Sequence, residues 1–256
     1  MSGDADSIIL RPVRRVGAVA VFLGQILMRV PGSLRRPGLT VAQIYNAGAR
    51  SLIIIMMSGL FVGMVLGLQG FNLLQRFGSA DQVGVAVALG LLKELGPVVT
   101  ALLFAGRAGT SLTSEIGLMK ATDQLTAMQM MAVDPVRQVV VPRFLGGFIA
   151  MPLLAAMFSA IGLYGGQLIA VAQMGVDSGA YWSNMQNAVA MREVSEGIFK
   201  SLAFGLACSL VAVYEGFHAA PTAEGVGLAT TRTVVVSSVL VLLLDFLLTA
   251  AFFTNT

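Results

Sequence analysis

One stretch of the chain, residues 52–68, reads LIIIMMSGLFVGMVLGL and contains no charged residue. Such a long apolar run is typical of a helix that crosses a bilayer, which needs about 20 predominantly apolar residues. Gly59, Gly63 and Gly67 recur within it at four-residue spacing, so they share one face of the helix. Because glycine lets two helix backbones approach closely in a membrane, we expect this face to pack against another span.

Four further stretches are predominantly apolar, and they lie at residues 83–104, 139–171, 198–213 and 234–253. Together with the first they predict an all-α integral membrane protein with about five transmembrane helices. The composition agrees, because 56% of the residues are apolar and only 11% are charged, whereas a soluble domain carries about 25% charged residues. The stretch 139–171 is longer than one crossing needs, so we expect it to tilt or to extend beyond the membrane.

The amino-terminal segment, residues 1–44, differs from the transmembrane domain predicted for residues 45–256. Its apolar run at residues 16–28 is too short to cross a bilayer and is flanked by arginines. We expect an amphipathic interfacial helix, with its arginines meeting anionic head groups at the cytoplasmic face. A poorly ordered basic tail is the alternative. The residues expected to break the helix are Pro31, Gly32, Pro37 and Gly38. The flanking arginines are Arg11, Arg14, Arg15, Arg29, Arg35 and Arg36.

Basic residues also set the expected orientation, because positively charged loops stay in the cytoplasm. The amino-terminal segment and the connection between the second and third spans are basic, so we place both inside. The connections at residues 69–82 and 172–197 are expected on the opposite side, residues 215–232 inside, and the carboxyl terminus outside. The basic residues of the connection between the second and third spans are Arg107, Lys120, Arg137 and Arg143.

Motifs of catalysis are missing from the sequence. It contains no GxxxxGK[ST] phosphate loop, so we expect neither ATP hydrolysis nor a bound cofactor in this chain itself. HExxH and GxSxG are absent too, and the single histidine, His218, and single cysteine, Cys208, exclude a Cys/His metal cluster. The net charge of +3 is typical of cytoplasmic arginines rather than of nucleic-acid binding. A membrane-embedded lipid-modifying enzyme is the alternative function, although the sequence offers no convergent catalytic set.

Residues 115–133 mix charged residues with leucines and methionines, and this pattern predicts an amphipathic helix on the cytoplasmic side. Such a helix can dock in a groove of a partner protein, where methionines fill irregular contacts. A helix that merely lies on the bilayer surface is the alternative, and the residue pattern alone favours the two about equally.

Charged residues also occur inside the predicted spans, where each needs a partner. Asp245 lies in the last span, and we expect it to form a structural salt bridge with Arg232 or Arg107 rather than to relay protons. Lys93 and Glu94 lie in the second span.

The stretch around Glu94 closely resembles the MlaE family of phospholipid ABC transporter permeases. Residues 94–125 read ELGPVVTALLFAGRAGTSLTSEIGLMKATDQL, and the resemblance covers nearly the whole chain after Tyr45. The other stretches that carry it are GMVLGLQG at 63–70, MAVDPVR at 131–137, VPR at 141–143, MQNAV at 185–189 and TTRTVV at 230–235.

The resemblance implies five transmembrane helices behind an interfacial helix, in the bacterial inner membrane. It implies a homodimer with two copies of a cytoplasmic ABC ATPase that holds ATP and Mg²⁺, a STAS-domain protein and a periplasmic MCE-domain hexamer. The implied function is the permease subunit that moves glycerophospholipids between inner and outer membranes and so maintains outer-membrane lipid asymmetry. Residues 115–133 are implied to be the coupling helix that sits in the ATPase groove. Its expected coupling residues are Glu115, Ile116, Gly117, Met119, Lys120 and Asp123.

In such a dimer, a lipid cavity at the interface must suit both acyl chains and a phosphate. Lys93 is the best-placed cation for the phosphate, and Glu94 is expected to pair with Lys93, with an arginine or with an amine on the lipid. An ion pair between Lys93 and Glu94 that only holds helices together is the alternative, and it is weakened because adjacent helix residues point in different directions. The expected apolar lining is Leu66, Phe71, Leu74 and Phe77, near the outer end of the first span.

Overall fold

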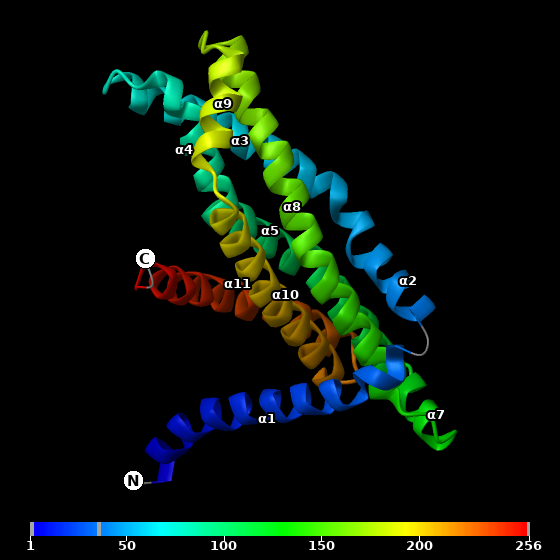
Figure 1. The fold of residues 1–256 in the computed structure, drawn as a ribbon. Coiled ribbons are helices and arrows are strands. Elements are labelled where there is room, and N and C mark those ends of the chain that lie inside the picture. The colour runs from blue at the N-terminus through cyan, green and yellow to red at the C-terminus, as the bar shows by residue number, and fades with distance from the viewer. Residues whose placement is uncertain (1–2, 35–36, 255–256) are drawn as a thin grey trace.

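The computed structural model describes residues 3–34 and 37–254 of the chain. These ranges are almost entirely helical and contain no strand, and inside a bilayer a helix satisfies its own backbone hydrogen bonds. The helices form an elongated bundle, and α1 lies across one end of it (Figure 1). The α-helices are α1 (Gly3–Leu34), α2 (Pro37–Ala47), α3 (Leu52–Gln75), α4 (Val83–Leu89), α5 (Gly96–Phe104), α6 (Thr110–Ala121), α7 (Gln124–Met130), α8 (Val141–Ala172), α9 (Ser178–Ala188), α10 (Met191–His218) and α11 (Ala223–Thr254). Tighter 3₁₀ turns are η1 (Ala49–Ser51) and η2 (Ala80–Gln82), and wider π-helical segments are η3 (Gly90–Leu95), η4 (Ala105–Gly109) and η5 (Val136–Val140).

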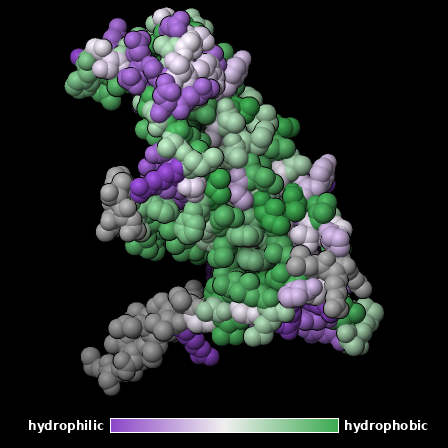
Figure 2. All heavy atoms as spheres, viewed as in Figure 1, coloured by the Kyte–Doolittle hydropathy of each residue, from purple (hydrophilic) through white to green (hydrophobic). Residues whose placement is uncertain are grey.

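The part of the chain that the structure describes has 5 helical segments long and apolar enough to cross a membrane, which confirms the predicted number of spans. Figure 2 shows apolar residues over the middle of the bundle and hydrophilic residues gathered towards its two ends. The third span has 37 residues, or about 55 Å of helix. That length exceeds a hydrocarbon layer of about 30 Å, so this span must tilt or extend beyond it. The 5 segments are Pro37–Gln75, Ala80–Ala121, Val136–Ala172, Met191–His218 and Ala223–Phe252.

The glycine face of the first span packs directly on α8, as the four-residue spacing predicts. A Cβ atom added to Gly59 would lie 2.7 Å from the carbonyl oxygen of Phe158, and one added to Gly67 would lie 2.8 Å from that of Gly166. Gly63 faces Gly162 even more closely. A side chain at these positions would collide with backbone, so the glycines permit the close approach of α3 and α8.

Helix α1 is held against the end of the bundle by an apolar side. Phe22 and Ile26 are buried in a cluster with residues of α8 and α10, and the Phe22 ring meets the Tyr214 ring edge to face at 5.6 Å between centroids. Its exposed side includes Val21, Leu27 and Met28. An apolar helix that lies across the bundle rather than along it fits the predicted interfacial helix.

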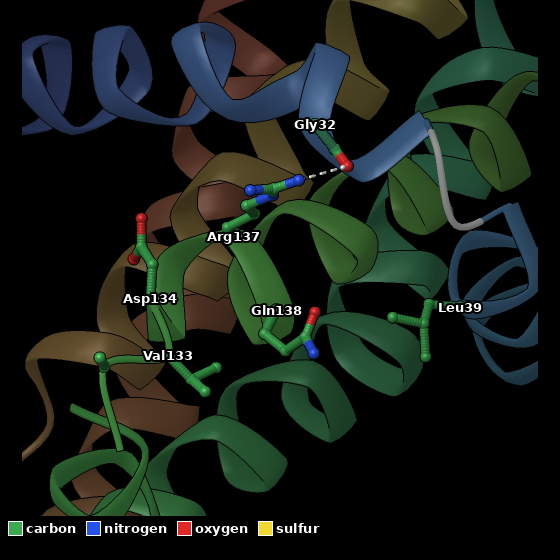
Figure 3. Close-up of a pocket in the computed structure, with 7 residues that line it drawn as sticks. Gly32, Leu39, Val133, Asp134, Arg137 and Gln138 are labelled. Carbon is green, nitrogen blue, oxygen red and sulfur yellow. Dashed lines mark hydrogen bonds between the residues drawn. The ribbon is translucent and has the colours of Figure 1, made fainter. Parts of the chain in front are cut away.

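Polar contacts fix the carboxyl-terminal end of α1 beside a cavity of about 280 Å³. Arg29 Nε donates to Asp134 Oδ2 at 2.5 Å, and Arg137 donates to the carbonyl oxygen of Gly32 at 3.2 Å (Figure 3). Partial burial raises the pKa of Asp134. Hydrogen bonds from Arg29 and from the Val136 backbone, together with the charge of Arg29, lower it by more, so the pKa lies below its ordinary value.

Pro31 and Gly32, two of the residues expected to break the amino-terminal helix, do not end it. Helix α1 continues through Pro31 and Gly32 to Leu34, and α2 begins at Pro37. A proline suits the first position of a helix because its missing N–H has no partner there. Arg35 and Arg36 lie outside the described residues, and so do the side chains of Arg11 and Arg15.

The predicted single helix over residues 115–133 is wrong. Residues 115–121 belong to α6, which continues the second span without a break, and α7 is a separate helix that ends at Met130. Asp123 separates the two in a left-handed conformation with φ of 56°. Aspartate tolerates this backbone region better than most residues, so a single position turns the chain where the periodicity of the sequence suggests continuity.

Candidate functional site

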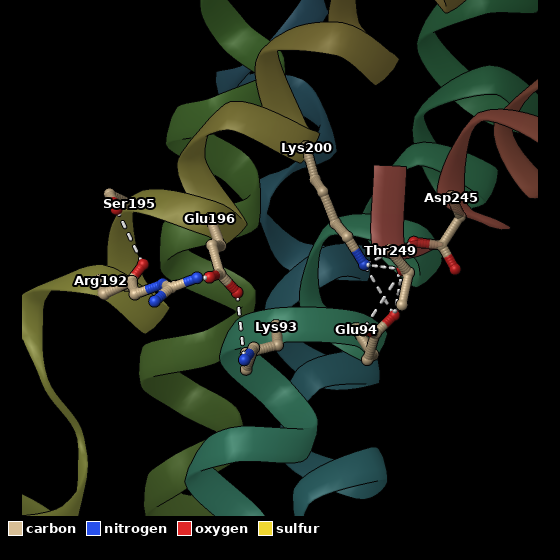
Figure 4. Close-up of polar contacts among 8 residues, drawn as sticks. All are labelled: Lys93, Glu94, Arg192, Ser195, Glu196, Lys200, Asp245 and Thr249. Atoms are coloured by element: carbon tan, nitrogen blue, oxygen red, sulfur yellow. Dashed lines mark hydrogen bonds and ion pairs between the residues drawn. The ribbon is translucent and has the colours of Figure 1, made fainter. Parts of the chain in front are cut away.

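Lys200 of α10 lies at the centre of a polar network inside the spans. Its side chain is 2% exposed, and its Nζ donates to Glu94 Oε2 at 2.7 Å, to Asp245 Oδ1 at 2.9 Å and to Thr249 Oγ1 at 2.6 Å (Figure 4). An ammonium group has three N–H donors, so these partners use all of them. The contact joins the second, fourth and fifth spans.

This cluster has unequal numbers of opposite charges. Lys200 supplies one positive charge, whereas Glu94 and Asp245 supply two negative charges. Glu94 is 40% exposed at its side chain and Asp245 is 22% exposed, while Lys200 is buried. The negative side of the cluster therefore faces outward, where its carboxylate oxygens can accept further hydrogen bonds.

A second charged cluster lies beside the first. Glu196 Oε2 lies 3.1 Å from Lys93 Nζ, and Glu196 Oε1 lies 3.1 Å from Arg192 Nε (Figure 4). Glu196 is 10% exposed, and the two cations are 33% and 50% exposed. Lys93 and Arg192 thus share the carboxylate of Glu196.

The backbone around Lys93 and Glu94 is a π-helical segment, η3, followed directly by Gly96 and Pro97. Pro97 has no N–H to donate to the carbonyl group four residues earlier, and its ring crowds that carbonyl. A wider π turn relieves this conflict and is frequent at functional sites. The proline thereby sets the directions in which Lys93 and Glu94 leave the helix.

The expected pairings of the intramembrane charges need correction. Asp245 pairs with Lys200 rather than with Arg232 or Arg107. Lys93 and Glu94 do not pair with each other, because Lys93 binds Glu196 and Glu94 binds Lys200. Arg107 instead donates to the carbonyl oxygen of Asn46 at 3.2 Å, and Arg232 is exposed on α11.

Sequence reasoning missed Lys200, Glu196 and Thr249. A signal for Lys200 was present, because a lysine inside the apolar stretch 198–213 needs a partner for the same reason as Asp245 does. Thr249 carried no such signal, since a hydroxyl group is common in membrane helices and can bond to its own backbone.

The expected coupling residues do not share one surface. Ile116 and Gly117 are buried, where a Cβ on Gly117 would meet Val226. Lys120 donates to the carbonyl oxygen of Phe217 at 2.9 Å. Glu115, Met119 and Asp123 are at least partly exposed, and Glu115 accepts hydrogen bonds from Arg143 and Ser111.

The four residues expected to line the acyl chains also differ in how deeply they are buried. Phe71 is buried in the core of the chain, and Leu66 and Leu74 pack against that core. Phe77 is 75% exposed at the end of the first span. Their role in binding lipid stays a prediction. Among the described residues, no group of histidine, cysteine and acidic side chains could hold a metal ion.

Comparison with known proteins connects this arrangement to a family. The model of the family described as permease MlaE matches residues 40–251. The chain belongs to the MlaE permease family. The intermembrane phospholipid transport system permease protein MlaE of Haemophilus influenzae is 51% identical to this MlaE-family chain over 241 residues, which cover 94% of the chain and 92% of that protein.

More distant relatives also match most of this MlaE-family chain. A probable ABC transporter permease protein of Rickettsia felis is 34% identical over 252 residues, 97% of each protein. The chloroplastic protein TRIGALACTOSYLDIACYLGLYCEROL 1 of Arabidopsis thaliana is 28% identical over 236 residues, 92% of this chain and 67% of that protein. The Lys200 network lies wholly within the family match, whereas α1 precedes it.

Proposed function

We propose that this chain is the membrane-spanning permease subunit of an ATP-driven transporter that moves glycerophospholipids between inner and outer membranes and so maintains outer-membrane lipid asymmetry. The observation that carries the proposal is the 51% identity, over nearly the full length, to a permease named for intermembrane phospholipid transport. The relatives named as ABC transporter permeases support an ATPase as the energy source. The chain itself then catalyses no reaction, and ATP and Mg²⁺ bind to the partner ATPase.

The second span provides a mechanical path for this transport. It runs as one helical segment, Ala80–Ala121, that includes Glu94 and ends just after Lys120. Movement of the ATPase against the corner between α6 and α7 would therefore act on the Lys200 network through one continuous helical segment. The network also ties in the fourth and fifth spans, so the spans would move together.

The ATPase contact is proposed at this corner, around α7. Leu118, Met130 and Met131 are 60%, 80% and 69% exposed, which is unusual for side chains of their size. Methionine adapts to the shape of a partner groove. Of the residues expected to couple, Met119, Lys120 and Asp123 lie partly exposed or exposed at the end of α6 and before α7, Glu115 lies one turn earlier on α6, and Ile116 and Gly117 are buried.

The two charge clusters suit a phospholipid head group. Lys93, which is 33% exposed, offers positive charge to a phosphate, and Glu94 offers a partly exposed carboxylate to an amine. Leu66, Phe71 and Leu74 lie along the outer part of α3, and Phe77 follows just after its end, where they would line the path of the acyl chains.

Partner surfaces are proposed for the remaining subunits of the complex. Only 11% of the most apolar window of α11 is buried in the single chain, which suits a homodimer interface or lipid contact. The homodimer would bind two ATPase copies and a STAS-domain protein in the cytoplasm, and an MCE-domain hexamer in the periplasm. The amino terminus would be cytoplasmic and the carboxyl terminus periplasmic, in the bacterial inner membrane, because the basic connections lie at the α1 end.

The test is native purification followed by transport. The tagged chain is isolated in nanodiscs with its copurifying proteins and lipids identified by mass spectrometry, and transfer of a labelled glycerophospholipid from the same sample is then measured with and without ATP. We expect an ATPase, bound glycerophospholipid and ATP-dependent transfer. Recovery of the chain without ATPase or lipid would contradict the proposal, and a chemically altered lipid made by the chain alone would favour the enzyme alternative.

A further inference from the structure

A second group of cations lies towards the cytoplasmic end of the spans, away from the Lys200 network. Arg50 follows α2 in the turn η1, and Arg107 belongs to η4 of the second span. Their side chains line one small cavity of about 20 Å³, together with Asn46 and Glu115. A space of this size holds about one oxygen atom or one water molecule, so a larger group would sit at its mouth.

Positive charge is in excess at this cavity. Glu115 already accepts hydrogen bonds from Arg143 and Ser111 at 3.2 Å each. Arg107 uses one N–H on the Asn46 carbonyl and keeps other donors of its guanidinium. Arg50 is exposed and has no ion-pair partner within residues 3–34 and 37–254. Two arginines thus line the cavity with one carboxylate, and that carboxylate is already paired with Arg143, so positive charge is in excess there.

An exposed apolar stripe begins one helical turn after Arg50. Ile53, Ile54 and Met57 are 78%, 46% and 48% exposed, and Phe61 further along is 57% exposed. Positions 50, 53, 54, 57 and 61 are spaced as residues on one helix face. The cation and the apolar stripe therefore form one continuous surface along α3.

We propose that this surface binds a phospholipid, with its phosphate between Arg50 and Arg107 and an acyl chain along Ile53, Met57 and Phe61. Arginine binds phosphate oxygens through paired N–H groups, and it does so best where the charge is partly removed from water. The two halves of the surface match the two halves of the ligand: unbalanced cations lie at the border of the apolar run, and exposed apolar side chains continue from them. A free anion would use only the first half, and an apolar partner helix only the second.

This surface is distinct from the Lys93 and Glu94 clusters. Arg107 follows Glu94 by 13 positions on the same helical segment, which is about 20 Å along the helix. That separation places the two phosphate-binding groups in opposite halves of a bilayer of about 30 Å. The inference deepens the proposed function by assigning a separate site to lipid of the cytoplasmic leaflet, and binding there needs neither ATP nor transport.

The experiment measures lipid contact directly. A photoreactive benzophenone side chain replaces Met57, and the full chain is reconstituted without ATP in vesicles that contain radiolabelled phosphatidylglycerol or, separately, radiolabelled diacylglycerol, which has acyl chains but no phosphate. Crosslinked lipid is compared among the unaltered chain and the variants Arg50→Gln, Arg107→Gln and Arg50→Lys. Arg76→Gln is the matched control, because Arg76 is an exposed arginine at the other end of α3.

We expect Arg50→Gln and Arg107→Gln each to lower phosphatidylglycerol crosslinking by about fivefold, since a charged hydrogen bond to the phosphate is lost. Arg50→Lys should give an intermediate yield, because lysine keeps the charge but not the paired N–H groups, and Arg76→Gln should leave the yield unchanged. Unchanged crosslinking in Arg50→Gln, or equal yields from diacylglycerol and phosphatidylglycerol, would overturn the proposal. Complete competition by inorganic phosphate would assign the cations to a free anion and overturn it too. ATP-dependent transfer is measured separately, so failure of this site is distinguishable from failure of the transport function.

Discussion

Lys200 and Glu94 lie 106 positions apart in the sequence, yet Lys200 Nζ is 2.7 Å from Glu94 Oε2. The contact joins two long apolar helices through their charged residues. An ion pair in this setting is held because each isolated charge would be costly in hydrocarbon, so the second and fourth spans must pack in a register that lets the two residues meet.

Replacing Lys200 tests this role. Lys200→Met leaves Glu94 and Asp245 without their shared cation, so we expect a loss of stability of about 3 kcal/mol. The measurement is reversible unfolding in mixed micelles, with Arg76→Met as the exposed control. The triple variant Lys200→Met, Glu94→Gln, Asp245→Asn should recover much of the loss because no charge then lacks a partner. Equal stability of the single and triple variants would show that the charges do not interact as described.

The glycine contact between α3 and α8 can be tested by a single methyl group. Gly63→Ala places a Cβ against the backbone of Gly162, which cannot move without displacing α8, so we expect a loss of about 3 kcal/mol. Gly70→Ala, on the same helix, meets only Val83 Cγ2 at 3.4 Å and should change stability by less than about 1 kcal/mol. Thermal unfolding of both variants in the same detergent is the measurement. A similar transition temperature for the two would refute the close approach.

Docking of α1 should depend on pH through Asp134. The pKa of Asp134 is lowered in the folded chain, so its ionised form stabilises α1 above the ordinary carboxyl value of 3.8, and this contribution is lost as the pH falls through the lowered folded value. We expect the distribution of distances between spin labels at positions 21 and 126 to broaden on acidification from pH 7 to pH 3. Asp134→Asn should be broadened already at pH 7 and respond little to acid. An Asp134→Asn variant as ordered as the unaltered chain would rule out this attachment.

The exposed methionines beside α7 should bind the ATPase. Met130→Ser combined with Met131→Ser removes apolar contact area without disturbing the fold, because both side chains are exposed. We expect binding of the ATPase to weaken about tenfold, or about 1.4 kcal/mol. Met191→Ser is the control. Met191 is also highly exposed, at 81%, but it is the first residue of α10, at the amino-terminal end of the fourth span. Affinity is measured by titrating purified ATPase onto immobilised nanodiscs, and equal affinity of all variants would exclude α7 as the contact.

Apolar run length was sufficient to predict the spans, because the hydrophobic thickness of a bilayer requires a long uninterrupted helix and little else. The spacing of Gly59, Gly63 and Gly67 likewise predicted a packed face, because helical periodicity is a local property. Local rules failed at Asp123, where one residue in a left-handed conformation divides an apparently continuous helix.

The sequence by itself therefore determined how many segments of this protein are long and apolar enough to cross a membrane, that the glycine face of the first packs closely, and that charges inside the spans need partners. Only the tertiary structure decided which charges meet: Asp245 and Glu94 share Lys200, and Lys93 binds Glu196. The physical reason is that hydrophobicity and helical period are properties of neighbouring residues, whereas an ion pair depends on the rotation and register of separate helices, which the packing of the whole bundle fixes.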